Sequence, residues 1–458
     1  MAPKGAEYSE IAHRRAVEKN THVTFPQLKY PSLRDTGLKD SVQWLEGKAM
    51  DDGAEGLWRV HNGLYDLDAF INKHPGGVDW LELTKGTDIT EAYESHHFSK
   101  SVDTILAKYY VRDAKTPRNS PFTFDDNGFY RTLKRAVAEE LPKVPKNVTK
   151  LSDRIIDSLF AAYLLLAAFS CYTKVPVLAN MSWMLASLML AWTVVASHNY
   201  IHRRSNWRMH LFSMTLWSYR DFRVSHVLSH HLYPNTLMDL EVSAFEPLVY
   251  WTPRKDKPFF SRYFAFLIEV LYFPFATFVY FFVRNLSAIF RKDYFKKHWR
   301  ITDLVGFLVP LWMWVVSGAT FYHVFTTWLC IIAGASLTFY KIGSNAAHHH
   351  PDIWKDGDQP SYNTETPDWG VHELEAVMDR KDINSGHFTI MTFFGNHALH
   401  HLFPTLDHAT LTYLYPMFIE YAQKFRANFR MTNQFDLFIG QYKCAYNTEF
   451  KILDKKEE

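Results

Sequence analysis

VLANMSWMLASLMLAWTVVASHNYIH, residues 177–202, is an apolar stretch that runs directly into two histidines. Residues 177–197 would extend about 30 Å as a helix, which is enough to cross the apolar part of a bilayer. His198 and His202 follow at an i, i+4 spacing, so both side chains lie on one helical face at the membrane surface. This stretch therefore predicts a membrane protein with a histidine-rich site at the end of a span.

Further apolar segments predict a membrane region built from helical hairpins. Residues 156–172 are long enough for a short crossing, and 177–197 returns the chain to the side it started from. Arginines follow that return, as expected on the cytosolic side of a span. Residues 303–340 are long enough for two short spans broken near Ser317. We therefore expect four crossings, with both termini on the cytosolic side.

A third apolar stretch, residues 263–283, differs from the others. It contains Glu269 and Pro274, and basic residues flank it on both sides. Basic flanks at both ends indicate that both ends are cytosolic. We therefore expect an interfacial or re-entrant helix pair here rather than a crossing.

Composition narrows the class of protein. Of the 458 residues 47% are hydrophobic and 23 are histidines, while a net charge of +2 gives no reason to expect nucleic acid as a partner. The three cysteines, Cys171, Cys330 and Cys444, lie far apart without a CxxC pair, which disfavours a disulfide framework or a thiolate zinc site. Residues 1–20 are polar and lack the apolar core of a secretory signal.

The composition along the chain predicts five regions. A polar arm precedes a small soluble domain with two short strands around Asn62-Gly63, which we expect to form the hairpin turn. A linker rich in Pro, Lys and Asn follows, with a helix expected at 127–141. The regions are 1–38 (arm), 39–115 (small domain), 116–150 (linker), 151–430 (membrane domain) and 431–458 (tail).

Two more histidine groups, HVLSHH and HALHH, follow the first. They contain His226, His230 and His231, and His397, His400 and His401. In a regular helix His397, His400 and His401 would lie on one face. His231, in contrast, would stand about 140° from His226. The last two histidines of each group begin a similar segment, HHLYPN or HHLFPT, and the proline of that segment would end the helix. His387 and His408 have no such spacing, and we expect structural roles for them.

Converging neutral imidazoles indicate a transition-metal site. The lack of cysteine ligands and of HExxH disfavours structural zinc and a metalloprotease, which leaves iron as the leading candidate. Soluble di-iron bundles use paired ExxH motifs, which are not placed in that way here. A single histidine pair could be merely hydrogen-bonded, but three groups beside membrane spans favour metal binding.

At these residues the chain resembles the membrane fatty-acid desaturase superfamily, over about 151–430. The resemblance implies an all-α membrane domain of about four transmembrane helices plus interfacial helices, with two non-haem irons that activate dioxygen. It implies these catalytic metal ligands: His198, His202, His226, His230, His231, His397, His400 and His401. It adds His348 of NAAHHHP, 345–351, as a ninth metal ligand, while His349 should point elsewhere.

The second and third groups depart from the superfamily pattern. The second group has one residue more than HxxHH, which puts either His226 or His231 in doubt as a ligand unless the helix is distorted. The third group begins with His397, where front-end desaturases have Gln. The resemblance therefore does not imply front-end activity.

Residues 39–115 resemble cytochrome b5, an α+β haem domain. The resemblance rests on Leu57-Trp58, GLYD at 63–66, Phe70, HPGG at 74–77 and DITE at 88–91. It implies haem b with His74 as one axial ligand. The second ligand is His97 by the usual spacing, with His96 as the alternative. The whole layout is most similar to the cytochrome b5-related proteins, a desaturase-like group.

Together the resemblances imply a fatty-acyl desaturase that uses O2 and electrons from its own haem domain. The substrate would be an acyl-lipid or acyl-CoA, and an NADH-cytochrome b5 reductase would supply electrons because no GxGxxG nucleotide motif follows a strand. The expected location is the endoplasmic reticulum membrane with a cytosolic active site, which the terminal KKEE, 455–458, fits. The alternatives are a fatty-acyl or sphingolipid hydroxylase, or a non-catalytic haem electron carrier.

Overall fold

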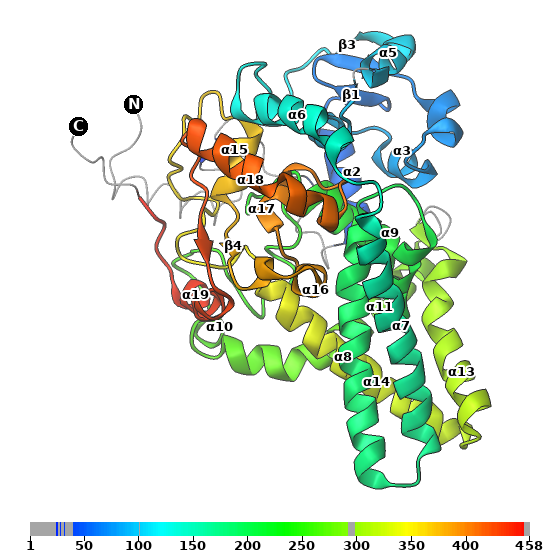
Figure 1. Cartoon of the computed structure of the whole chain (residues 1–458). Coiled ribbons are helices and arrows are strands. Elements are labelled where there is room, and N and C mark those ends of the chain that lie inside the picture. Colours follow the sequence, from blue (N-terminus) through cyan, green and yellow to red (C-terminus); the bar gives the residue numbers. More distant parts are fainter. Residues whose placement is uncertain are drawn as a thin grey trace.

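The computed structural model describes residues 24, 25, 28, 32, 40–99, 101–291 and 298–452. Long helices extend from one side of a head of shorter elements, and a small α+β domain lies at the far side of that head (Figure 1). The terminal KKEE segment lies outside the described residues. Phe25 and Leu28 are fully buried, so for these two residues the expected loose arm is wrong: both are apolar and pack into the head.

The small domain is built on a three-stranded antiparallel sheet in the order β1-β2-β3. Val60 pairs with Gly63, so His61 and Asn62 form the hairpin turn. The expected Asn62-Gly63 turn is wrong by one residue, because His61 takes the positive φ of 53° and Gly63 joins the ladder. The elements are α2 Ser41–Asp51, β1 Trp58–Val60, β2 Gly63–Tyr65, η1 Asp68–Lys73, α3 Val78–Thr84, α4 Thr90–His96, α5 Ser101–Leu106, η2 Ala107–Tyr109 and β3 Tyr110–Asp113.

The segment 116–150 is packed rather than extended. It contains α6, Phe129–Glu140, inside the range predicted for a helix, and the short η3, Leu141–Lys143. One face of α6 is buried, with Tyr130 and Leu133 wholly inaccessible to solvent. The Tyr130 hydroxyl donates to the carbonyl oxygens of Glu94 at 3.1 Å and Leu402 at 3.3 Å. This connection therefore joins the small domain to the head.

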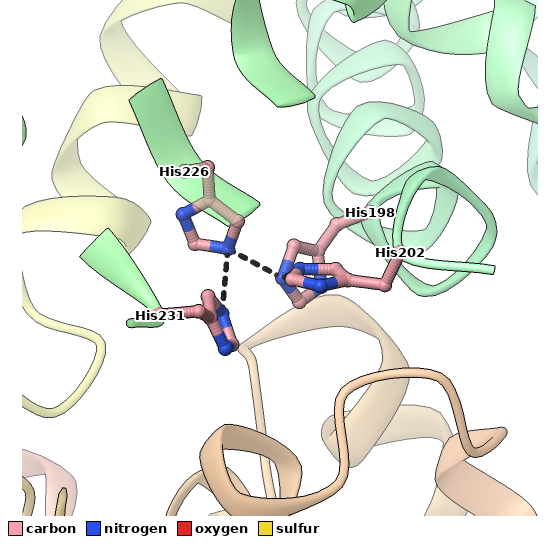
Figure 2. A group of neighbouring side chains, drawn as sticks. All are labelled: His198, His202, His226 and His231. Atoms are coloured by element: carbon pink, nitrogen blue, oxygen red, sulfur yellow. Dashed lines mark hydrogen bonds between the residues drawn. The ribbon is translucent and has the colours of Figure 1, made fainter. Parts of the chain in front are cut away.

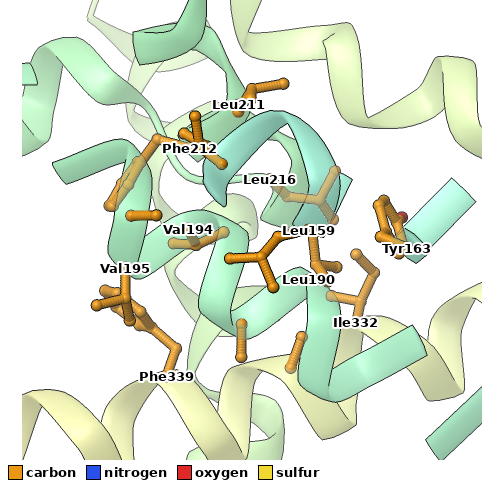
Figure 3. Packing of buried hydrophobic residues seen from close by; sticks show 14 of the residues in the cluster. Leu159, Tyr163, Leu190, Val194, Val195, Leu211, Phe212, Leu216, Ile332 and Phe339 are labelled. Carbon is orange, nitrogen blue, oxygen red and sulfur yellow. The ribbon is translucent and has the colours of Figure 1, made fainter. Parts of the chain in front are cut away.

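Within the described residues, four helices are long and apolar enough to cross a membrane: α7 Thr149–Tyr172, α8 Pro176–Ile201, α11 Ala265–Phe290 and α14 Phe321–Ser344. A shorter apolar stretch, Ile301–Ser317, comprises η6 Ile301–Phe307 and α13 Leu308–Ser317. Buried side chains such as Leu190, Val194 and Ile332 pack between α7, α8 and α14 (Figure 3). The lower ends of α7, α8, α13 and α14 extend together away from the head (Figure 1).

The third apolar stretch is one helix, α11, rather than the expected helix pair. Pro274 lies inside it without dividing it, since in apolar surroundings backbone groups have no water to replace their helical hydrogen bonds. Near α10 the helix lies across the direction of α7 and α8 (Figure 1). Its 26 residues and apolar composition would also permit a crossing.

The head is made of short elements that follow the membrane helices. They are η4 Trp207–Thr215, α9 Tyr219–Phe222, η5 Arg223–His230, α10 Phe259–Tyr263, α15 Trp369–Glu375, β4 Asp379–Arg380, η7 Ile383–Ser385, α16 His387–Thr392, α17 His397–Leu402, α18 His408–Lys424, β5 Met431–Thr432 and α19 Gln434–Tyr446. Strands β4 and β5 pair in parallel. The three histidine groups lie at the end of α8, in and next to η5, and in α17, so they come together where α8 reaches the head.

Candidate metal centres and haem site

The structure gathers the nine predicted metal ligands into two neighbouring groups. In each group of four, one ring nitrogen from every member lies within 4.8 Å of the others, and all members are buried. The first group is His198, His202, His226 and His231 (Figure 2), and the second is His230, His348, His397 and His401. His400, the ninth, places its Nε2 atom 3.2 Å from that of His198 and so joins the first group.

The first group depends on the end of α8 and on η5. The Nε2 atoms of His198 and His202 are 2.9 Å apart, as their shared helical face predicts. The Nε2 atom of His226 lies 2.7 Å from that of His198 and 3.0 Å from that of His231. Four imidazoles from two distant segments thus point their Nε2 atoms at one place (Figure 2).

A π-helix explains how His226 and His231 can face the same point. Residues 223–230 form η5, a π-helix, and the backbone N–H of His231 donates to the carbonyl oxygen of His226 at 2.9 Å. In this wider turn residue i+5 lies below residue i, so the angle expected for a regular helix does not apply. The extra residue in HVLSHH therefore excludes neither His226 nor His231 as a ligand of the first group. In the same π-helix His230 faces the second group.

The second group takes one histidine from the NAAHHHP tract. The Nε2 atom of His348 lies 3.0 Å from that of His230, 2.8 Å from that of His397 and 3.2 Å from that of His401. His349 points away and stacks on Trp251, with ring centroids 4.1 Å apart. The structure thus places His348 among the other predicted ligands and His349 apart from them.

His408, for which we expected a structural role, lies beside the first group. Its ring centroid is 4.7 Å from that of His400, and it forms a further potential metal-binding set with His198 and His400. No spacing signal in the sequence indicated this, because His408 approaches from the start of α18. His387 instead pairs its Nε2 atom with the Ser152 hydroxyl at 3.0 Å.

The chemistry of the two groups fits bound metal ions. Burial lowers the pKa of His231, His397 and His401 well below the usual histidine range, so these rings are neutral. A neutral imidazole has one donor and one acceptor nitrogen, and several Nε2 atoms that meet at one place cannot all be satisfied by hydrogen bonds to one another. A cation accepts all of their lone pairs together. Nitrogen-only sets of this kind suit iron, copper or zinc rather than magnesium or calcium.

Carboxylates that the sequence did not predict orient several of these rings. Asp239 Oδ2 lies 2.9 Å from Nδ1 of His230, and Glu241 Oε1 lies 3.0 Å from Nδ1 of His226. Glu373 Oε2 lies 2.9 Å from Nδ1 of His401. Such partners place the proton on Nδ1 and leave the Nε2 lone pair for a metal. The expected all-histidine site is thus surrounded by acidic residues, which tertiary contacts bring in from other segments.

Replacing Glu373 by alanine is expected to lower iron affinity about 10–100-fold, because His401 then loses the acceptor that fixes its ring. Glu373→Gln should lose less, since its amide oxygen can still accept from Nδ1. Iron retained during titration with a chelator measures the effect. Glu375→Ala on the same helix is the matched control, because Glu375 contacts Ser361 and Asn428 instead of a histidine. Equal iron loss in the Glu373→Ala and Glu375→Ala variants would contradict the assignment.

The small domain brings the rings of His74 and His97 close together, and we call the space between them the crevice. Nδ1 of His74 donates to the Gly77 carbonyl and Nδ1 of His97 to the Tyr93 carbonyl, both at 3.0 Å. The ring centroids of His74 and His97 are 6.3 Å apart, which suits an iron between two Nε2 atoms at about 2 Å each. Burial lowers the pKa of His97 to about 4, so its ring is neutral.

His96 turns away from this crevice. Its ring packs against Trp80, with centroids 5.6 Å apart, and its Nδ1 atom lies 2.9 Å from the Ser95 hydroxyl. The geometry thus favours His97 over His96 opposite His74. Gly76 fits the close approach, because a Cβ there would stand 2.9 Å from Cε1 of His74.

A cavity of about 460 Å³ borders the metal groups. His226, His230, His348 and His397 form part of its lining. Aromatic side chains from several elements line its walls: Trp217, Phe245, Tyr272, Tyr280, Phe339 and Tyr340. Such a space suits an extended apolar molecule better than a polar one.

Comparisons with known proteins agree with both halves of the chain. Residues 174–433 match the family described as Fatty acid desaturase, and residues 43–115 match the Cytochrome b5-like Heme/Steroid binding domain. No solved structure matches.

Among curated relatives, the Cytochrome b5-related protein of Drosophila melanogaster is 42% identical over 428 residues, which cover 92% of this chain and 95% of that protein. The Acyl-lipid (8-3)-desaturase of Mortierella alpina is 28% identical over 240 residues, 47% of this chain and 51% of that protein. The Probable Delta(5) fatty acid desaturase C of Dictyostelium discoideum is 22% identical over 441 residues, 87% of this chain and 93% of that protein.

Proposed function

Because the chain belongs to the fatty acid desaturase family and carries a cytochrome b5-like domain, we propose that it is a di-iron fatty-acyl desaturase with its own haem electron donor. The observation that carries the proposal is the pair of histidine groups bordering an aromatic cavity. The substrate would be an acyl-lipid or an acyl-CoA. We also propose the endoplasmic reticulum membrane as the location, with the histidine groups on the cytosolic side.

In this proposal nine histidines hold two iron ions. One ion would be held by His198, His202, His226, His231 and His400, and the other by His230, His348, His397 and His401. When bound, the iron pair supplies the dioxygen activation on which desaturases depend. The chain itself provides the apolar lining: the aromatic side chains of the cavity would bind the acyl chain beside His226, His230 and His348, which line the same cavity.

The small domain is docked with its haem crevice toward the histidine groups. The backbone N–H of Ser205, just after α8, donates to the carbonyl oxygen of Gly76 in the HPGG loop at 3.0 Å. Trp80 lies between the two regions, with its ring 4.5 Å from the Arg223 guanidinium. Arg223 in turn donates to the carbonyl oxygen of Ile201 at 3.1 Å, next to His202. A short protein route thus joins the crevice to the first group and supports electron delivery within one chain.

Asp79, a carboxylate of the small domain, fixes the contact between this domain and the head. Asp79 accepts hydrogen bonds from Arg220, from Arg223 at 3.1 Å and from the Tyr219 hydroxyl at 3.1 Å. Arg220 and Arg223 are both buried. Because Asp79 is already engaged, an NADH-cytochrome b5 reductase, the electron source we propose, would approach a different edge of the small domain in this docked state.

Asp79→Ala is expected to destabilise the docked state by about 3–5 kcal/mol, because two buried guanidinium groups lose their shared carboxylate. The reduced haem should then be reoxidised more slowly, and protease should cut the connection at 116–150 more readily. Stopped-flow haem absorbance and limited proteolysis measure these effects. Asp68→Ala is the control, since Asp68 forms an exposed ion pair with Lys85. Unchanged reoxidation and proteolysis in Asp79→Ala would contradict the docking role.

Lipid profiling of desaturase-deficient cells tests the proposed function. Cells that express the wild type should contain new double bonds, and both His400→Ala and His74→Ala should abolish them. New hydroxyl groups instead would identify a fatty-acyl or sphingolipid hydroxylase. Haem absorbance without any lipid change and without iron would identify an electron carrier. Either of these two results would overturn the proposal.

A further inference from the structure

An exposed aromatic surface lies where α10, the start of α11 and α19 meet. Helices α10 and α19 lie side by side in Figure 1, and the rings of Tyr263 and Tyr446 contact each other with centroids 5.4 Å apart. Large apolar side chains point outward from all three helices. They are Phe259, Phe260, Tyr263, Phe266, Phe435, Ile439 and Tyr446, and we call them the aromatic plane.

Apart from Asp436 and Lys443, the exposed side chains of α19 are apolar, although the helix already buries other side chains against the protein. Leu437, Gly440 and Ala445 are buried on the inner side. Phe435 is 70% exposed and Ile439, one turn further on, is 38% exposed. Soluble proteins rarely leave such a stripe uncovered next to further exposed aromatic rings.

Polar contacts fix α19 rigidly in this position. Tyr442 donates to Oε2 of Glu269 in α11 at 2.7 Å, and Gln441 donates to Oε1 of the same carboxylate at 2.6 Å. Lys341 of α14 completes this network through Glu269 and Tyr442. Close by, at the C-terminal end of α19, Lys257 donates to the carbonyl oxygen of Cys444 at 3.0 Å. The exposed stripe is therefore a feature of the fold rather than of a loosely attached tail.

Two observations identify what covers the aromatic plane. First, α11, which contributes Phe266 to the plane, also exposes Leu267, Leu271 and Phe275 at helical spacing. That helix is long and apolar enough to contact lipid along its length. Second, Arg262 and Lys443 flank the plane, and the Arg262 guanidinium lies 5.1 Å from the Tyr446 ring centroid. Aromatic rings with basic neighbours are typical of the boundary between lipid headgroups and acyl chains.

We propose that the aromatic plane inserts into the membrane surface, so that α19 is an interfacial anchor beyond the spanning helices. The inner side of the anchor packs against the cavity wall, because Ala445 and Ala265 share a buried cluster with Trp251, and Trp251 lines the cavity. The anchor therefore holds that wall at the level of the lipid headgroups. This inference concerns the position of the protein in the membrane and does not depend on the reaction.

Depth-dependent fluorescence quenching of the full chain in single-copy phosphatidylcholine nanodiscs tests the anchor. Phe435→Cys in a Cys330→Ser background carries an environment-sensitive dye, because Cys171 and Cys444 are buried. Nitroxides near the headgroup end of the acyl chain should quench this dye more strongly than nitroxides at the chain end, and aqueous iodide should quench it weakly. Tyr446→Cys, on the same face, should behave alike.

Two reference positions calibrate the depth. A dye at Glu365→Cys, on an exposed loop, should be quenched by iodide alone, and one at Val315→Cys on α13 by lipid nitroxides alone. Iodide quenching at residue 435 equal to that at residue 365 would overturn the proposal. Protection from both quenchers would also overturn it, because a protein partner would then cover the plane. Haem absorbance checks that each variant is folded.

Discussion

His348→Ala is expected to remove roughly half or more of the non-haem iron and to abolish the lipid product, while the haem spectrum stays unchanged. The reason is geometric: Nε2 of His348 lies within 3.2 Å of three other Nε2 atoms of the second group. The Ala376 carbonyl oxygen, 2.9 Å from its Nδ1 atom, holds the ring in place. Metal analysis together with haem absorbance measures both cofactors in one sample.

The adjacent histidine is the matched control for this prediction. His349 is buried as well, yet its ring stacks on Trp251 and belongs to neither group. His349→Ala should keep its iron even if the altered cavity binds substrate less well. Iron retained in His348→Ala, or lost equally from both variants, would contradict the assignment of His348 as a ligand.

His97→Ala is expected to abolish stable haem binding, because one of the two imidazoles of the crevice is then missing. The iron content should remain, since the histidine groups belong to a different region. His96→Ala should keep the haem absorbance, because the His96 ring faces Trp80 rather than His74. A pyridine haemochrome assay on purified protein gives the haem content. Loss of haem from His96→Ala but not from His97→Ala would reverse the choice.

The histidine groups could be predicted from the sequence because their spacing reflects local helix geometry. The i, i+4 spacing of His198 and His202 places both rings on one face whatever surrounds the helix, and the structure places their Nε2 atoms 2.9 Å apart. A helix was also expected at 127–141, and α6 lies inside that range. The division of NAAHHHP came from the family resemblance, because three adjacent histidines alone do not reveal which ring faces a metal.

Features that depend on tertiary contacts could not be predicted from the sequence. The π-helix that brings His226 and His231 together is a distortion which their spacing required but could not demonstrate. Glu373 reaches His401 from another helix, so no short motif links them. The segment 116–150 has the composition of a loose linker, yet Tyr130 is buried between the domains because it bonds to both.

The proposed function requires nine histidines of this chain to hold two irons beside a haem domain that supplies electrons. The most direct test is the ratio of non-haem iron to haem in the purified full-length protein, measured together with His231→Ala and His348→Ala. We expect about two non-haem irons for each haem in the wild type and at most about one in each variant. A wild-type ratio of one or zero, or a ratio that neither substitution changes, would contradict the proposal that these histidines hold two irons.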